Sequence, residues 1–231
     1  MASAELDITD PARVREFAAR IQSDYPSLNV LINNAGVFKH EDLTDPSAGL
    51  EDAEATVTTN LLGPIRLTAA LLPLLQQQPR STVVNLTSGL AFVPMTVAPT
   101  YCATKAALHS YTVSLRHQLR GSTTEVIELI PPYVQTDLTP GQSADPLAMP
   151  LGECLAEVMA LFTSHPPGGE IVVELQAAPL RRGEQSLRGD VPGAKPGVSD
   201  AASGSVAKLI IDGRPSYFQF PDCRRRIPRI E

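Results

Sequence analysis

Short apolar runs alternate with helical patterns through the first two-thirds of the chain, and this alternation restricts the possible folds. Residues 28–33, 81–87 and 125–130 are apolar and rich in β-branched side chains, as is typical of buried strands. Residues 50–75 and 98–119 have the length and pattern of helices. Strands that alternate with helices build βαβ units. The sequence therefore predicts an α/β fold with a parallel sheet.

Further elements are predicted on either side of this central part. Asp10 is suited to cap a helix that begins at Pro11, because proline is favoured at the first helical position. A bend is expected near Pro64 in the long helix of residues 50–75. Residues 151–162 predict an amphipathic helix, and residues 170–174 predict a strand.

We expect two regions along the chain. Residues 1–178 are predicted to form the α/β domain. Residues 179–231 are expected to be an atypical, partly disordered tail, because they begin with a stretch rich in Gly, Pro, Ser and Arg without periodicity. Within this tail, residues 206–211 and 216–220 flank an Asp-Gly pair and predict a hairpin.

Composition and charge exclude several classes of function. The 231 residues are 43% hydrophobic and 19% charged, as in ordinary globular proteins. A net charge of −6 argues against a nucleic-acid or anionic membrane partner. The three cysteines are widely spaced and indicate neither a disulfide framework nor a zinc site. The N-terminus lacks the pattern of a signal peptide, and no apolar stretch is long enough to span a bilayer. A soluble, cytoplasmic protein is expected.

Tyr101 and Lys105 are one helical turn apart, so their side chains share a face. A nearby ammonium favours the phenolate, so we expect the pKa of Tyr101 to be lowered. Such a tyrosine can donate a proton to a carbonyl or accept one from an alcohol. Ser88 ends a predicted strand and could hold the same substrate oxygen. Because Tyr-x-x-x-Lys also occurs by chance, this interpretation depends on the surrounding residues.

Three segments that could line a site follow predicted strands. Asn34, Ser88 and Pro132 each come directly after, or close to, the end of one of these strands. Ligands of parallel sheets collect at the carboxyl ends of the strands. One crevice could therefore be lined by three distant parts of the chain.

Several motifs together resemble those of the short-chain dehydrogenases/reductases in order and spacing. They are Leu6-Asp7-Ile8-Thr9-Asp10, Asn33-Asn34-Ala35-Gly36, Asn60, Ser88, Tyr101-x-x-x-Lys105 and Pro131-x-x-Val134-x-Thr136. Residues 25–37 and 87–94 look most similar to the branch of DltE-like oxidoreductases. The resemblance implies a Rossmann-like, doubly wound parallel sheet. It also implies carbonyl reduction or alcohol oxidation on a small molecule with NADP or NAD.

The resemblance assigns catalytic roles to four residues. Tyr101 would be the general acid/base, Lys105 would modify its pKa and contact the ribose, and Ser88 would bind the substrate oxygen. Asn60 matches the family's asparagine in a helix kink, which organises a water between Lys105 and solvent. By residue type alone, Asn60 could equally be a helix-surface asparagine.

The same resemblance implies several cofactor contacts. Asp7 matches the residue that contacts adenine, although it could be a plain turn or cap residue. Asn34 matches a cofactor contact behind a strand, although it could belong to an ordinary turn. Arg66 could reach the cofactor, but a solvated helix arginine is the favoured interpretation. Val134 and Thr136 match the segment that touches the nicotinamide carboxamide, and Tyr101 and Lys105 complete this cofactor set.

The sequence departs from the family pattern in two places. Pro132 stands where the family usually has glycine, which stiffens this loop. No Gly-x-x-x-Gly-x-Gly motif occurs, so we expect the first two βα units, with their phosphate-binding loop, to be absent. The strand at residues 30–32 would then be an open edge. The apolar helix face that carries Val14, Phe17 and Ile21 would be short of partners.

Two functions are consistent with these features. The first is an NAD(P)-dependent oxidoreductase of the short-chain dehydrogenase type. The alternative is a catalytically impaired, truncated relative that acts by binding a partner or by oligomerising through its exposed edge. Relatives commonly pair through the helices that correspond to residues 50–75 and 98–119, so a homo-oligomer is possible.

Overall fold

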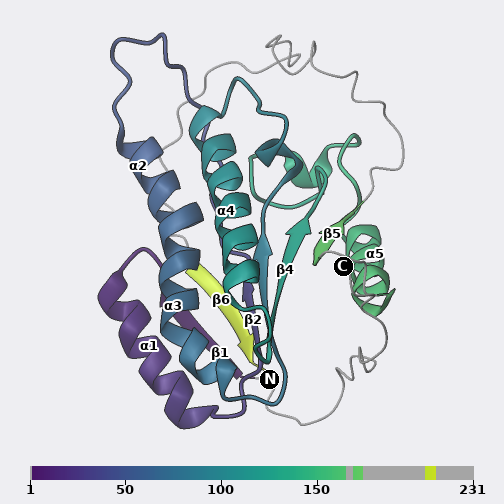
Figure 1. Ribbon diagram of the computed structural model, residues 1–231. Coiled ribbons are helices and arrows are strands. Elements are labelled where there is room, and N and C mark those ends of the chain that lie inside the picture. The colour runs from purple at the N-terminus through teal and green to yellow at the C-terminus, as the bar shows by residue number, and fades with distance from the viewer. Residues whose placement is uncertain (1, 165–168, 174–205, 212–231) are drawn as a thin grey trace, which may run out of the picture.

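The computed structural model describes residues 2–164, 169–173 and 206–211. Helices and strands alternate along most of this chain (Figure 1). In order they are β1 (Ala2–Asp7), α1 (Pro11–Asp24), β2 (Val30–Asn33), α2 (Glu51–Val57), a π-helical segment (Thr58–Leu62), α3 (Gly63–Gln76), β3 (Ser81–Leu86), a 3₁₀ turn (Gly89–Ala91), α4 (Pro99–Gln118), β4 (Thr124–Ile130), a second 3₁₀ turn (Gln142–Ala144), α5 (Leu151–Ser164), β5 (Glu170–Val172) and β6 (Val206–Ile211).

The main sheet is parallel, with four strands in the order β2-β3-β4-β5. Its register aligns Leu31 with Val83 and Val83 with Val126, so three strands each contribute one buried residue to a row across the sheet. Because successive strand residues point to opposite faces, the next row belongs to the other face. The apolar runs of the sequence therefore supply two cores, one on each side of the sheet.

Helices cover both faces of this sheet. Leu31, Val83 and Val126 belong to the core that also contains apolar residues of α1, α3 and α4. Val84 and Ile127, one position further along their strands, belong to the core under α5. Figure 1 shows α3 and α4 side by side, with α5 beyond β5. The expected α/β architecture with a parallel sheet is confirmed.

The β2 strand is the edge of the main sheet, as predicted. In the part of the chain that the structure describes, β2 pairs with β3 alone. Ile32 points away from the face that buries Leu31 and is 49% exposed. By contrast, the expectation that α1 would lack partners is wrong. Val14, Phe17 and Ile21 are buried in the core shared with α3, and β1 also contacts α1.

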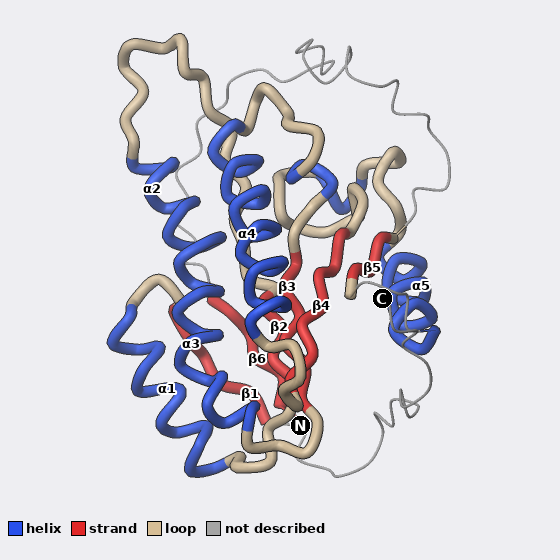
Figure 2. The backbone as a smooth tube through the Cα atoms, in the orientation of Figure 1, coloured by secondary structure: helices blue, strands red, loops and turns tan. Residues whose placement is uncertain are grey.

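Strands β1 and β6 form a separate antiparallel pair, which lies beside the helices in Figure 2. The strand at residues 206–211 was expected, and among the described residues it pairs with the N-terminal strand. Residues 216–220, its predicted hairpin partner, lie outside the described residues. The expected disorder of residues 179–205 also concerns residues outside the described part. Among the described residues, no helix is both long and apolar enough to cross a bilayer.

The long helix is interrupted by a π-helical segment at Thr58–Leu62. The N–H of Gly63 donates to the carbonyl oxygen of Thr58, five residues earlier, which is the π-type spacing. Pro64 follows and has no N–H to offer the preceding turn. The bend expected near Pro64 thus takes the form of a π segment immediately before it. Gly63 also allows close packing, because a Cβ atom there would lie 2.6 Å from Cδ1 of Ile8.

Candidate active site

A buried polar layer lies at the carboxyl ends of the central strands, on the face covered by α3 and α4. The register aligns Asn33 with Asn85 and Asn85 with Glu128, and none of the three is more than 5% exposed. The Nδ2 atom of Asn33 donates to Oγ1 of Thr68 (2.9 Å) and to Oδ1 of Asn85 (2.7 Å). Asn85 in turn donates to Oγ1 of Thr112 in α4 (2.9 Å). Apolar packing therefore changes to hydrogen bonding where the predicted site residues lie.

Tyr101 lies in the first turn of α4 and is 6% exposed. Its ring packs against Phe38, with 4.8 Å between the ring centroids, and its hydroxyl is hydrogen-bonded to the side chain of Ser88. Burial raises the pKa of Tyr101, and the hydrogen bond to Ser88 acts in the opposite direction. The predicted lowering of this pKa by Lys105 is therefore wrong, because burial of the phenol dominates.

The position of Lys105 explains this difference. Its Nζ atom donates to the carbonyl oxygen of Leu86 at 2.9 Å and lies 5.7 Å from the centroid of the Tyr101 ring. The ammonium is thus bound to the end of β3 and faces the ring of Tyr101. Lys105 is only 5% exposed, and this burial lowers its own pKa to about 8.

Asn60 lies in the π segment and is fully buried, so the alternative of a helix-surface asparagine is wrong. Its Oδ1 accepts from the backbone N–H of Val37, and its Nδ2 donates to the backbone oxygen of Val37, both at 2.8 Å. A Cβ atom on Gly36 would lie 3.3 Å from Oδ1 of Asn60 and 3.8 Å from Nζ of Lys105. The segment after β2, the helix kink and Lys105 therefore meet at one place.

Asp7 and Arg66 both bind Thr9. The Oδ1 atom of Asp7 accepts from the N–H of Thr9 (2.9 Å) and from its hydroxyl (2.7 Å). These bonds lower the pKa of Asp7. The Nη1 atom of Arg66 donates to the carbonyl oxygen of Thr9 (3.0 Å), so Arg66 is not simply a solvated helix arginine. Asn34 is exposed at the end of β2.

The loop after β4 carries Val134 and Thr136. Gln142, which is only 6% exposed, donates from Nε2 to the carbonyl oxygen of Val134 (2.7 Å) and to Oγ1 of Thr136 (3.2 Å). One buried amide therefore fixes both predicted contact residues. No sequence pattern pointed to Gln142, because its partners are backbone and hydroxyl groups in a loop without periodicity.

The family profile described as short chain dehydrogenase matches residues 1–146, which is more than half of the 231 residues. The chain belongs to the short-chain dehydrogenase family. The resemblance inferred from the spacing of Asn60, Ser88, Tyr101 and Lys105 is thereby confirmed at the level of the family.

Individual relatives agree with this assignment. The chain is 43% identical over 134 residues to "Uncharacterized oxidoreductase DltE" of Bacillus subtilis, in a match that covers 58% of this chain and 53% of the relative. It is 29% identical over 131 residues to "NADP-dependent 3-hydroxy acid dehydrogenase YdfG" of Shigella flexneri, which covers 57% of this chain and 52% of the relative. The chain thus spans about half the length of these curated relatives.

A solved structure shows the same fold. It is a short-chain dehydrogenase from Burkholderia cenocepacia in complex with NADP, with a TM-score of 0.63 and 24% identity. The match covers 73% of this chain and 67% of that one.

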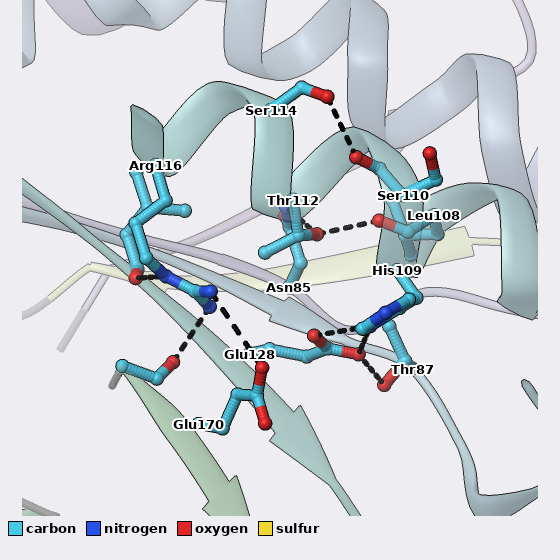
Figure 3. A network of polar contacts seen from close by, with 12 residues as sticks. Asn85, Thr87, Leu108, His109, Ser110, Thr112, Ser114, Arg116, Glu128 and Glu170 are labelled. Atoms are coloured by element: carbon cyan, nitrogen blue, oxygen red, sulfur yellow. Dashed lines mark hydrogen bonds and ion pairs between the residues drawn. The ribbon is translucent and has the colours of Figure 1, made fainter. Parts of the chain in front are cut away.

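The candidate site contains a cluster that the sequence motifs did not identify. Glu128 in β4 accepts from Oγ1 of Thr87 (2.7 Å) and contacts Nδ1 of His109 in α4 (2.8 and 3.0 Å) (Figure 3). Two signals could have pointed to it. His109 is one turn beyond Lys105 on the same face of α4, and Glu128 is a charged residue within an apolar strand.

Proposed function

We propose that this short-chain dehydrogenase is an NAD(P)-dependent oxidoreductase that reduces a small carbonyl compound or oxidises the corresponding alcohol. The observation that carries the proposal is the meeting of Ser88, Tyr101 and Lys105 at the carboxyl end of β3. These groups arrive from a strand end and from two turns of one helix. Such an arrangement is suited to proton transfer on a substrate oxygen.

Tyr101 would exchange the proton, and Ser88 would hold the same substrate oxygen. The raised pKa of Tyr101 keeps its phenol protonated at neutral pH, which suits donation to a carbonyl oxygen. The ammonium of Lys105 has three N–H bonds, and the carbonyl oxygen of Leu86 accepts one of them. The other two would be available to a ribose hydroxyl. Asn60 would keep the kinked helix and Val37 in place beside this amine.

The residues on the nicotinamide side fit a dinucleotide. Gly36 brings the backbone close to Lys105, and Gln142 fixes Val134 and Thr136 in the loop after β4. When bound there, the nicotinamide would supply or accept the hydride. Asp7, Asn34 and Arg66 are further proposed contacts. NADP is favoured over NAD because the Shigella relative is named as NADP-dependent and the Burkholderia structure contains NADP.

A second candidate function rests on a different observation. Within the described residues β2 pairs on one side only. Ile32, a residue of this strand, is 49% exposed. An open apolar edge favours strand addition or self-association. Residues 1–178 would then be a Rossmann-type domain that binds a partner or oligomerises, with its catalytic groups retained from an active ancestor.

Cofactor binding distinguishes these two functions. The melting temperature of the chain is measured with saturating NADPH and, separately, with saturating NADH. A ligand at about a thousand times its dissociation constant stabilises the folded protein by about 4 kcal/mol, so a clear upward shift is expected with NADPH. No shift with either dinucleotide would contradict the enzyme proposal and favour the binding function.

The role of Tyr101 is tested by Tyr101→Phe. This variant should lose carbonyl reduction while keeping the thermal shift with NADPH, because only the hydroxyl that exchanges the proton is removed. Tyr111→Phe is the matched control, since Tyr111 lies in the same helix and its hydroxyl contacts Thr68. Reduction by Tyr101→Phe at the wild-type rate would refute the assignment.

A further inference from the structure

Glu128 has an unusual position for a carboxylate. Its side chain is completely buried within β4, where both oxygens accept hydrogen bonds or contacts from Thr87 and His109. Burial of a carboxylate is costly unless its oxygens are satisfied. Even a satisfied buried ion pair often adds no stability over apolar side chains of similar volume. Stability of the fold is therefore a weak explanation for a glutamate here.

The helix α4 places three side chains, one per turn, against three consecutive residues at the end of β3. The pairs are Tyr101 with Ser88, Lys105 with the carbonyl oxygen of Leu86, and His109, through Glu128, with Thr87. The third contact differs from the other two, because it passes through a residue of the neighbouring strand. His109, Glu128 and Thr87 therefore link α4, β4 and the end of β3, and we call these three residues the brace.

This brace fixes both ends of the segment that carries Ser88. On one side, Thr87 donates its hydroxyl to Glu128 at 2.7 Å and its N–H to the carbonyl oxygen of Leu129 at 2.9 Å. On the other side, the ring of His109 meets the ring of Phe92 edge-on, with 4.8 Å between centroids. Phe92 directly follows the 3₁₀ turn that Ser88 caps. The position of Ser88 is thus set by these contacts of its neighbours, together with its own bond, in which Oγ of Ser88 accepts from the N–H of Leu90 (3.1 Å).

We propose that Glu128, held by His109, is a positioning residue that fixes Thr87 and thereby directs the hydroxyl of Ser88 at Tyr101. This role rests on the proposed function, because it assumes that Ser88 and Tyr101 take part in proton transfer to the substrate. Neither Glu128 nor His109 needs to touch a substrate. Their effect reaches the reacting oxygen through Thr87 and Ser88.

The acidity of Tyr101 reports on this arrangement without cofactor or substrate. The hydrogen bond from Ser88 lowers the pKa of Tyr101, against the larger effect of burial. A displaced Ser88 should therefore raise this pKa further. Lys105 and Cys102 are the other titratable groups beside Tyr101, and both are the same in every variant compared.

The test is a titration of Tyr101 by fluorine NMR in the full chain. Ring-fluorinated tyrosine is incorporated at all five tyrosines, which also makes the phenols more acidic, and the Tyr101 signal is identified by its loss in Tyr101→Phe. Ser88→Ala defines the full upward shift of the titration midpoint. Thr87→Val is expected to give at least half of that shift. The double variant Thr87→Val/Ser88→Ala should match Ser88→Ala alone, because both act on one contact.

The matched control is Thr124→Val. The hydroxyl of Thr124 is also buried and pairs with Oγ of Ser81 across the same two strands (2.9 Å), but at their opposite end. It should lower stability about as much as Thr87→Val and leave the Tyr101 titration unchanged. An unchanged titration in Thr87→Val, or an equal shift in Thr124→Val, would overturn the proposal.

A second variant covers the case in which Thr87→Val does not fold. Glu128→Gln keeps the volume of the side chain, but it offers Thr87 and His109 one acceptor oxygen in place of two. It should raise the Tyr101 midpoint by an intermediate amount, and a wild-type titration curve would contradict the proposal. Because no turnover is needed, loss of the brace and absence of enzymatic activity give separate results.

Discussion

Asn60 binds the backbone of Val37 through both ends of its side-chain amide. Each of the two hydrogen bonds is 2.8 Å long, and Asn60 is completely buried in the π-helical segment. A single side chain thereby satisfies the donor and the acceptor of a loop residue that has left the edge strand β2. The irregular turn of the helix and the irregular loop stabilise each other.

Replacement of Asn60 should therefore reduce stability. In Asn60→Asp the carboxylate still accepts from the N–H of Val37 but cannot donate to its carbonyl oxygen. A buried polar group that loses its partner costs about 1–3 kcal/mol, so we expect a decrease of this size in the free energy of unfolding, measured by urea denaturation. Asn34→Asp is the control, since Asn34 is exposed, and it should change stability by no more than about 0.5 kcal/mol.

Gly36 is predicted to be intolerant of a methyl group. The Cβ atom in Gly36→Ala would lie 3.3 Å from Oδ1 of Asn60, which the bonds to Val37 hold in place. We expect a loss of about 1 kcal/mol in unfolding free energy, as for other overpacked sites, and a smaller thermal shift with NADPH. Gly152→Ala, in α5 with open space at its Cβ position, should be neutral or stabilising. Equal losses in both variants would contradict this explanation.

The buried Lys105 should make stability depend on pH. Its pKa is lowered from 10.5 to about 8 in the folded chain, so between these values the unfolded chain binds more protons than the folded chain. The free energy of unfolding therefore rises with pH in this window, and the cost of the buried charge is greatest below about pH 8.

Lys105→Met should remove this pH dependence. At neutral pH the variant is expected to be more stable than the wild type, by up to about 3 kcal/mol, and the advantage should disappear toward about pH 10. Urea denaturation over this range measures both effects. Lys39→Met is the control, because Lys39 is partly exposed beside Asp52. A wild-type stability that falls from about pH 8 upward, relative to Lys105→Met, would show the sign to be wrong.

Glu41 is predicted to stabilise the first turn of α4. Its carboxylate accepts from the N–H of Thr100 (3.1 Å) and from Oγ1 of Thr100 (2.6 Å), whereas Ala98 at the cap position has no capping side chain. Glu41→Ala should cost about 1 kcal/mol, as does loss of an ordinary N-cap. Hydrogen exchange should become faster in the turn that carries Tyr101. Glu16→Ala, on the exposed face of α1, should leave this exchange unchanged.

The local pattern of the sequence was sufficient to predict most of the fold. β3, β4 and α4 lie within one or two residues of the predicted ranges, because alternation and helical spacing reflect burial that each segment imposes by itself. Among the described residues β2 pairs on one side only, and this edge also followed from the missing motif. The pairing of β6 with β1 could not be predicted, because strand pairing between segments more than 190 residues apart leaves no local signal.

For the candidate site, the sequence determined which side chains are present and on which elements they lie. The spacing of Tyr101 and Lys105 put both on one helix face, and Ser88 was placed at a strand end. Only the tertiary structure decided their electrostatics, since the burial of Tyr101 raises its pKa and Lys105 binds the carbonyl oxygen of Leu86. Desolvation and hydrogen bonding depend on segments that are distant in sequence, and these meet only when the sheet assembles.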